Sequence, residues 1–301
     1  MTNLFSKHPL FKEGVLWYSI KTLFMYHHIA KKSLGQNFLN NQAIIDKIIT
    51  AASPTTTETV LEIGPGKGIL TKSLVACAGT TIAIEKDNGL FAHLGELFEQ
   101  EVNQGKLSLT HGDALDFDPE TLRSYGSYKL VANIPYNITG AIIEKFLSCS
   151  FQPTMMVLMV QKEVAERIVA KNKKTGGRGK ESILSIAVKA YGEPEYICTV
   201  KAGNFTPAPK IDSAVIKINN ISREKFLNKH HEEVFFQIMK AGFAHKRKTL
   251  AGNLKNILEP ELVTAILSSS KLSPSTRAED LGINDWLVLA HLVYNNQYVT
   301  E

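Results

Sequence analysis

The chain has 301 residues, enough for one large domain and a smaller second one. Hydrophobic residues make up 44% and charged residues 21%, which is typical of a globular protein and argues against a disordered or fibrous chain. The net charge of +5 is small, so where the basic residues lie matters more than their number. The three cysteines, Cys77, Cys149 and Cys198, lack CxxC spacing, so we expect no metal site, no disulfide framework and a reducing compartment.

Residues 1–30 differ in character from the rest of the chain. The stretch 15–29 is apolar and aromatic but is interrupted by Lys21 and two histidines, so it is too short to span a membrane. No small-residue cleavage site of a signal peptide follows it. A mitochondrial presequence is an alternative, although the stretch contains no arginine. We interpret residues 1–30 as an N-terminal extension with an amphipathic helix, and Met25 as a second candidate start, because organised sequence begins at Lys31.

A glycine-rich turn follows the first predicted strand. Residues 31–39 (KKSLGQNFL) form a basic lead into a helix, and residues 59–63 form a short strand. The next residues, 64–68, read GPGKG and precede an amphipathic helix. Glycines at Gly64 and Gly66 let the backbone turn tightly and let a ligand approach main-chain N–H groups. The spacing is neither a dinucleotide fingerprint nor a Walker loop, so this turn alone is a weak signal.

Polar residues follow the next strands at their carboxyl ends. Residues 81–84 form a strand that ends in Glu85, which is placed to accept hydrogen bonds from both ribose hydroxyls of a nucleoside. Residues 106–110 form a strand that leads to Asp113, which could accept from an adenine amine. The fourth strand ends in Asn133. Because these ends share one edge of a parallel sheet, they predict a nucleoside-binding site.

The fourth strand runs into the tetrapeptide Asn-Ile-Pro-Tyr at residues 133–136. Asn133 offers an amide acceptor and donor, and Pro135 fixes φ so that its carbonyl can point outward. Tyr136 offers a flat face on which a base can stack. This combination suits a planar exocyclic amine that must become nucleophilic. The alternative is an ordinary proline turn with a buried tyrosine.

The following segments complete the sheet and add two loops. Residues 171–180 carry five basic residues, three glycines and no acid, so they are either a solvated loop or a contact for a phosphate backbone. The loop 204–213 carries two prolines and presents Phe205, a second stacking plate opposite Tyr136 or else a buried core residue. Strands are predicted at 154–160, 196–200 and 214–218, and helices at 161–170 and 182–191, with Val164, Ile168 and Val169 facing the core.

Past residue 220 the pattern is helical only, so we place a domain boundary there. Helices are predicted at about 223–242, 245–257, 260–268 and 284–296. The segment 241–255 carries four basic residues and no acid. Such a face is useful for RNA, although by charge alone it is usually a solvated helix.

Together these stretches resemble the ribosomal RNA adenine dimethyltransferases of the KsgA/RsmA type from about residue 31 to residue 293. The most specific matches are KKSLGQNFL, LEIGPGKGILT, NIPYNIT, FTPAPKIDSAV and HKRKTLAGNL. The related macrolide-resistance rRNA methylases share QNF and NIPY, but GPGKG and HKRKTL favour the dimethyltransferases. At Ala251 and Gly252 the chain departs from the Arg-Asn that this family often has, and residues 1–30 have no counterpart.

The resemblance implies a fold, a reaction and a set of site residues. The fold is α/β, a Rossmann-like class I methyltransferase sheet with a small C-terminal all-helical domain. The domains are an extension (1–30), an S-adenosylmethionine-dependent methyltransferase domain (31–220) and a helical RNA-binding domain (221–301). The reaction is dimethylation of the exocyclic amine of two adjacent adenosines near the 3′ end of small-subunit 16S rRNA, within a pre-ribosomal 30S particle. We expect a cytoplasmic monomer without a membrane partner.

By motif match, the catalytic residues are Asn133, Pro135, Tyr136 and Phe205. The cofactor-binding residues are Asn37, Leu39, Gly64, Gly66, Glu85, Asp113 and Asn133. Asn133 and the Pro135 carbonyl would accept the hydrogens of the target amine, while Tyr136 and Phe205 would hold the flipped adenine.

Two other functions fit parts of the pattern. Glu85 also suits the ribose of NAD in an oxidoreductase, but the glycine spacing and the lack of a hydride-handling His or Tyr-Lys pair argue against that class. A non-catalytic RNA-binding or transcription factor on a methyltransferase fold would have a degraded cofactor loop or tetrapeptide, and both are intact here.

Overall fold

The computed structural model describes residue 31, residues 34–169 and residues 179–297. The predicted extension (1–30) and most of the predicted cationic loop lie outside these residues. None of the described helices is long and apolar enough to cross a membrane. Across the same described ranges, no group of His, Cys, Asp and Glu side chains could hold a metal ion.

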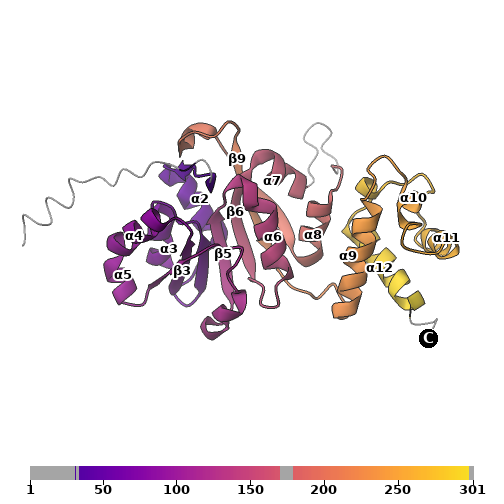
Figure 1. Ribbon diagram of the computed structural model, residues 1–301, viewed down its shortest axis with the longest axis horizontal. Coiled ribbons are helices and arrows are strands. Elements are labelled where there is room, and N and C mark those ends of the chain that lie inside the picture. Colours follow the sequence, from indigo (N-terminus) through magenta and orange to yellow (C-terminus); the bar gives the residue numbers. More distant parts are fainter. Residues whose placement is uncertain (1–30, 32–33, 170–178, 298–301) are drawn as a thin grey trace, which may run out of the picture. The chain divides into compact units, whose positions relative to one another are not determined.

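The centre of the molecule is a seven-stranded mixed sheet in the order β4-β3-β2-β5-β6-β9-β7 (Figure 1). Neighbouring strands from β4 through β6 pair in parallel, and β9 pairs antiparallel with both β6 and β7. This architecture confirms the predicted Rossmann-like fold. The strands are β2 (Thr59–Ile63), β3 (Thr80–Glu85), β4 (Leu107–His111), β5 (Tyr128–Asn133), β6 (Met155–Gln161), β7 (Glu193–Val200) and β9 (Ser213–Asn219).

The strands are apolar on both faces because helices cover both sides of the sheet. In β5, Val131 packs in one core cluster, while Leu130 and Ala132 pack in the cluster on the opposite face. The Val131 side is covered by α2 (Gln42–Ala52) and α3 (Ile69–Cys77), with α4 (Asn88–Leu97) and α5 (Glu99–Asn103) near β3 and β4. The other side is covered by α6 (Thr139–Ser148), α7 (Lys162–Val169) and α8 (Ile183–Tyr191).

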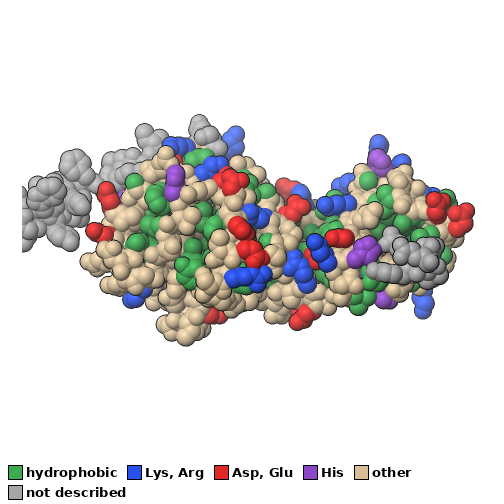
Figure 2. All heavy atoms as spheres, turned by 60° about the horizontal axis from the view of Figure 1, so that its bottom comes forward, with side chains coloured by type: hydrophobic (Ala, Val, Ile, Leu, Met, Phe, Trp, Pro, Cys, Tyr) green, Lys and Arg blue, Asp and Glu red, His purple; other side chains and the backbone are tan. Residues whose placement is uncertain are grey.

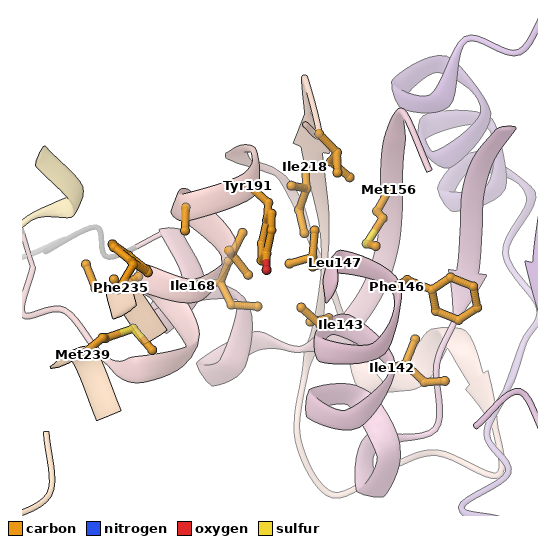
Figure 3. Close-up of a cluster of buried hydrophobic side chains, with 14 of the residues drawn as sticks. Ile142, Ile143, Phe146, Leu147, Met156, Ile168, Tyr191, Ile218, Phe235 and Met239 are labelled. Carbon is orange, nitrogen blue, oxygen red and sulfur yellow. The ribbon is translucent and has the colours of Figure 1, made fainter. Parts of the chain in front are cut away.

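The larger core cluster continues from the sheet into the C-terminal helices. Figure 3 shows Ile142, Phe146 and Met156 near the sheet and Tyr191, Phe235 and Met239 toward the tail. The tail helices are α9 (Lys229–Gly242), α10 (Leu250–Leu254), α11 (Pro260–Ser269) and α12 (Ile283–Gln297). The core is therefore continuous on both sides of residue 220, and the domain boundary placed there stays a prediction.

Two predicted tail helices begin later than expected. The helix predicted from 223 begins at Lys229, because Asn228 caps it by accepting a hydrogen bond from the His231 N–H at 2.9 Å. The helix predicted over 245–257 is only Leu250–Leu254, because Thr249 caps it and residues 244–248 form turns. The basic residues Lys246, Arg247 and Lys248 are therefore exposed in turns, and the prediction of a basic helix face was wrong.

Arg223 joins the start of the tail to the sheet-covering helices. Its guanidinium donates to the carbonyls of Ser148 (2.7 Å) and Cys149 (3.0 Å) at the end of α6. It also donates to Glu232 of α9 at 3.1 Å and lies 5.6 Å from the centre of the Tyr191 ring. One side chain thus fixes three elements at the junction.

Candidate functional site

A cavity of about 180 Å³ lies at the carboxyl ends of β2, β3 and β5 and after β4. This is the edge of the sheet at which the sequence predicted a nucleoside site. The structure brings all ten predicted site residues to its lining. They are Asn37, Leu39, Gly64, Gly66, Glu85, Asp113, Asn133, Pro135, Tyr136 and Phe205.

The glycine turn after β2 requires a backbone that other residues rarely adopt. Gly64 has φ 65° and Gly66 has φ 60°, both in the left-handed region. A Cβ atom on Gly66 would lie 3.0 Å from Cδ1 of Phe38. Gly66 therefore lets the loop and the Phe38 ring approach closely at the rim of the cavity.

Glu85 holds this turn from the end of β3. The residue is 6% exposed, and its Oε2 accepts a hydrogen bond from the Gly66 N–H at 3.1 Å while Oε1 accepts from the Asp87 N–H at 2.8 Å. Burial raises the pKa of this carboxyl, although the two N–H donors oppose the shift. The carboxyl is thus fixed in orientation before any ligand binds.

Asp113 follows β4 and is paired with a neighbouring lysine. Its Oδ2 lies 2.6 Å from the Lys86 ammonium, and its Oδ1 accepts from the Leu115 N–H at 2.9 Å. The hydrogen bond from Lys86 is the largest cause that lowers the pKa of Asp113. Asp113 is therefore a carboxylate at neutral pH, and a ligand amine would share it with Lys86.

Asn133 ends β5 and contacts the segment that covers the cavity. Its Nδ2 donates to the main-chain carbonyl of Asn37 at 3.2 Å. Its Oδ1 takes no hydrogen bond from any residue that the structure describes. The amide oxygen is consequently left as an acceptor at the cavity.

The Pro135 carbonyl, which the sequence predicted to point outward, already accepts hydrogen bonds within its own turn. It accepts hydrogen bonds from the Ile138 N–H at 3.2 Å and the Thr139 hydroxyl at 3.4 Å, so it supports the turn into α6. Ile134, between Asn133 and Pro135, also lines the cavity. A substrate amine would have to share the Pro135 oxygen with these two donors.

The two aromatic residues predicted to stack on the base differ in exposure: Tyr136 is half-buried and Phe205 is buried. The Tyr136 hydroxyl is 2.7 Å from the Ser213 hydroxyl, and burial raises the pKa of Tyr136. Phe205 is only 4% exposed and packs in the core cluster that contains Leu39, and the residue also lines the cavity. Phe205 is thus both a core residue and part of the cavity wall.

Two of the cavity-lining residues that the sequence analysis did not single out are Glu62 and Phe38. Glu62, in β2, is 1% exposed, and its Oε2 lacks a hydrogen-bond partner among the described residues. Burial is the main cause that raises its pKa to about 8. The signal was a lone acid in the apolar strand TVLEI. Phe38, with the Lys67 ammonium 5.1 Å from its ring centre, gave no such signal.

An S-adenosylmethionine molecule fits the chemistry of these residues. An orphaned buried acceptor such as Glu62 Oε2 needs a donor, and the ammonium group of an amino-acid moiety supplies one. Glu85 can accept from ribose hydroxyls and Asp113 from an adenine amine. The sheet order and this set of strand tips define a Rossmann-like, class I S-adenosylmethionine-dependent methyltransferase.

Comparisons with known proteins narrow the class. The chain belongs to the family described as Ribosomal RNA adenine dimethylase, which matches residues 27–294. It is an rRNA adenine dimethyltransferase, and its methyl donor is S-adenosylmethionine. This identification confirms the resemblance found in the sequence.

The relatives and solved structures agree with this family. The chain is 40% identical over 268 residues to "Ribosomal RNA small subunit methyltransferase A" of Dehalococcoides mccartyi strain 195, covering 88% of each chain. It is 39% identical over 279 residues to the protein of the same name from Nostoc punctiforme, covering 87% of this chain and 94% of the relative. A dimethyladenosine transferase from Plasmodium falciparum superposes with a TM-score of 0.66 at 29% identity, covering 86% of this chain and 98% of that one. The 23S rRNA methyltransferase ErmE shares the fold, with a TM-score of 0.67 at 24% identity, covering 86% of this chain and all of that one.

Proposed function

We propose that this enzyme dimethylates the exocyclic amines of two adjacent adenosines near the 3′ end of small-subunit rRNA. The observation that carries the proposal is the cavity in which Glu62, Glu85, Asp113 and Asn133 meet two aromatic rings. The names of the two bacterial relatives support the small subunit as the target. We further propose that it acts as a cytoplasmic monomer on a pre-ribosomal 30S particle.

The cofactor roles follow from the donors and acceptors at the strand tips. We assign the ribose hydroxyls to Glu85, the adenine amine to Asp113 and the amino-acid moiety to the Gly64–Gly66 turn together with Glu62. Asn37 and Leu39 belong to residues 34–39, here named the strap, which also lines the cavity. When bound, S-adenosylmethionine supplies an electrophilic methyl group on a sulfonium sulfur.

The target amine is conjugated with the adenine ring and is a poor nucleophile. We assign Asn133 Oδ1 to accept one of its hydrogens, which favours a pyramidal nitrogen with its lone pair available for transfer. A backbone carbonyl of the Ile134–Pro135 turn would accept the other hydrogen. The Pro135 oxygen would do so while it keeps its hydrogen bonds from Ile138 and Thr139. Tyr136 and Phe205 would hold the base after it leaves its RNA stack.

The RNA would reach this site across a groove beside the tail. A groove of about 1080 Å³ is lined by residues of α6, α8 and α9. Its lining includes the cations Lys180, Lys240, Lys246 and Lys248, together with carboxylates such as Glu279. Figure 2 shows a face on which basic and acidic side chains are interspersed, so we propose local phosphate contacts rather than one continuous basic field.

The test is a genetic replacement followed by analysis of the rRNA. Small-subunit rRNA from a deletion strain should lack both dimethyladenosines by mass spectrometry and by primer extension. Complementation with the wild-type chain should restore them, and complementation with Asn133→Ala should not. Full dimethylation in the deletion strain, or a loss confined to large-subunit rRNA, would overturn the proposed target.

A further inference from the structure

The strap that lines the cofactor side of the cavity is joined to the loop that carries Phe205. Residues 201–212, here named the proline loop, connect β7 to β9. Phe38–Leu39 of the strap form β1, and Phe205–Thr206 of the proline loop form β8. The two strands pair antiparallel, with Phe38 opposite Thr206 and Leu39 opposite Phe205.

Three further hydrogen bonds extend this pairing beyond the strands. The Asn40 N–H donates to the Asn204 carbonyl at 2.9 Å, and the Asn40 side chain donates to the Thr206 hydroxyl at 3.0 Å. The Asn41 side chain donates to the Asn204 Oδ1 at 2.6 Å. The Asn204 Nδ2 in turn donates to the Lys201 carbonyl at 2.8 Å, which fixes its amide within the proline loop.

The strap and the proline loop border different parts of the cavity, the first near the proposed cofactor groups and the second near the proposed position of the target base. On the strap, the Asn37 carbonyl accepts from Asn133 and the Phe38 ring packs against Gly66, so the strap borders the cofactor groups. On the proline loop, Phe205 lines the wall proposed for the target base. A change in the order of one side can therefore pass to the other through the β1–β8 pairing and through the side-chain bond between Asn41 and Asn204 that extends it.

We propose that Asn41 and Asn204 are positioning residues that make the strap and the proline loop one unit. A cofactor bound beside the strap then increases the order of Phe205, and a base held at Phe205 increases the order of the strap, because such coupling is reciprocal. The inference rests on the proposed function of the cavity and extends it. Since dimethylation uses two cofactor molecules in turn, each exchange of cofactor loosens the hold on the base.

The test measures amide hydrogen exchange by mass spectrometry on the full chain, with and without S-adenosylhomocysteine as the probe. In the wild type, the probe should slow exchange in peptides covering 34–39 and also in those covering 204–206, by about fivefold or more. In Asn41→Ser and Asn204→Ala the slowing at 34–39 should remain, while that at 204–206 should become smaller, because the β1–β8 pairing then links the two segments without the side-chain bond. Serine keeps an oxygen to cap α2, where Asn41 now accepts from the Ala43 N–H.

Gln42→Ala is the matched control, because the Gln42 side chain donates only to Asp46 of its own helix among the hydrogen bonds of the described residues. It should behave as the wild type. A merely structural role would raise exchange at 204–206 equally with and without the probe, and that result would overturn the inference. The inference would also be overturned if, in the wild type, the probe slowed exchange at 34–39 but left exchange at 204–206 unchanged. If the probe protects neither segment, the proposed cofactor cavity itself fails, and the inference fails with it.

Discussion

The side chain of Asn133 and the main chain of Asn37 are joined by a hydrogen bond of 3.2 Å across 96 positions of sequence. Because the Asn133 amide nitrogen is held by the strap, its oxygen is left as an acceptor at the cavity. This orientation explains why an asparagine, and not an aspartate, suits the position: a carboxylate has no donor for the Asn37 carbonyl.

Asn133→Ala should therefore lower turnover by roughly 100-fold or more, the scale for losing one positioned electrostatic group. Affinities for cofactor and RNA should change little, since other residues make those contacts. Single-turnover assays on small-subunit particles, with cofactor affinity measured by calorimetry, check this expectation. Rescue of the rate by raising the RNA concentration would show that Asn133 acts in binding instead.

Phe205 is best replaced by another large apolar residue, because truncating a buried phenylalanine to alanine costs about 3–5 kcal/mol of stability. Phe205→Leu removes the aromatic face and should lose about 1–3 kcal/mol of base stacking. Product should then stall more often at monomethyladenosine, because a loosely held base must be presented again for the second transfer. Leu74→Met, a swap in the same core cluster at a residue that does not line the cavity, is the control for packing. Equal product ratios in the two variants would assign Phe205 to the core alone.

The pKa of Glu62 predicts how stability depends on pH. Its pKa is about 8 in the folded protein, above the usual value of 4.5. Between these values the folded chain keeps a proton that the unfolded chain loses, so this group lowers the free energy of unfolding as pH rises through the window. The free energy of unfolding of Glu62→Gln, relative to that of the wild type, should therefore increase by roughly a few kcal/mol from pH 5 to pH 8. Urea unfolding of both proteins at pH 5 and pH 8 measures this difference. The same change with pH in both proteins would contradict the prediction.

The same residue predicts proton release on cofactor binding. If the cofactor ammonium pairs with Glu62, the carboxyl must lose its proton, so at pH 7 binding should release protons in the wild type. Calorimetry in buffers of different ionisation enthalpy should show this release, and Glu62→Gln should lack it. Equal proton release in both proteins would place the ammonium elsewhere.

The basic turn of the tail predicts the salt dependence of RNA binding. Replacing Lys246, Arg247 and Lys248 with alanine should weaken binding and make its salt slope shallower, by about one unit for each phosphate that these cations no longer neutralise. Lys106→Ala, on an exposed lysine just before β4, is the control and should leave the slope unchanged. An unchanged slope in the tail variant would show that these cations are only solvated.

Gly242 predicts a packing defect in the tail. A Cβ at this position would lie 2.5 Å from Cη2 of Trp286 and 3.0 Å from Cδ1 of Leu250. Gly242→Ala should therefore destabilise the protein by about 1–3 kcal/mol through overpacking, although alanine is the better helix former. Gly140→Ala, in α6 with open space around the Cβ, should not destabilise. Thermal unfolding of both variants compares the two effects.

The sequence predicted the sheet and the strand tips because both rest on local patterns. Two of the strands end in Glu85 and Asn133, Asp113 follows the end of a third, and parallel pairing brings those ends together. The covering strap could not be found this way: Asn37 and Leu39 came only from the resemblance to a family, since their contacts are with residues far away in the sequence. The pairing of Leu39 with Phe205 is of the same kind.

The errors were also physical in origin. The basic tail segment has helical composition, but the Thr249 hydroxyl accepts from the Gly252 N–H at 3.2 Å and starts the helix only after that turn. The bonds that the Pro135 carbonyl accepts could not be predicted either, because they depend on how the turn into α6 satisfies the Ile138 N–H. Glu62 was visible as an acid in an apolar strand, and burial of such a residue is itself a signal of function.

The pairing of β1 with β8 also has a consequence for biosynthesis. Phe38 and Leu39 are among the first described residues to leave the ribosome, but their partners Thr206 and Phe205 are made much later. Thr206 follows Asn40, whose side chain it meets, by 166 positions. Domains fold from the N-terminal side during synthesis at about 5–20 residues per second, so the nascent chain spends on the order of ten seconds with β2, β3 and β4 available for pairing and the strap still without its partner strand. The cavity of this rRNA methyltransferase is therefore completed only after the proline loop, which carries Phe205, has been translated.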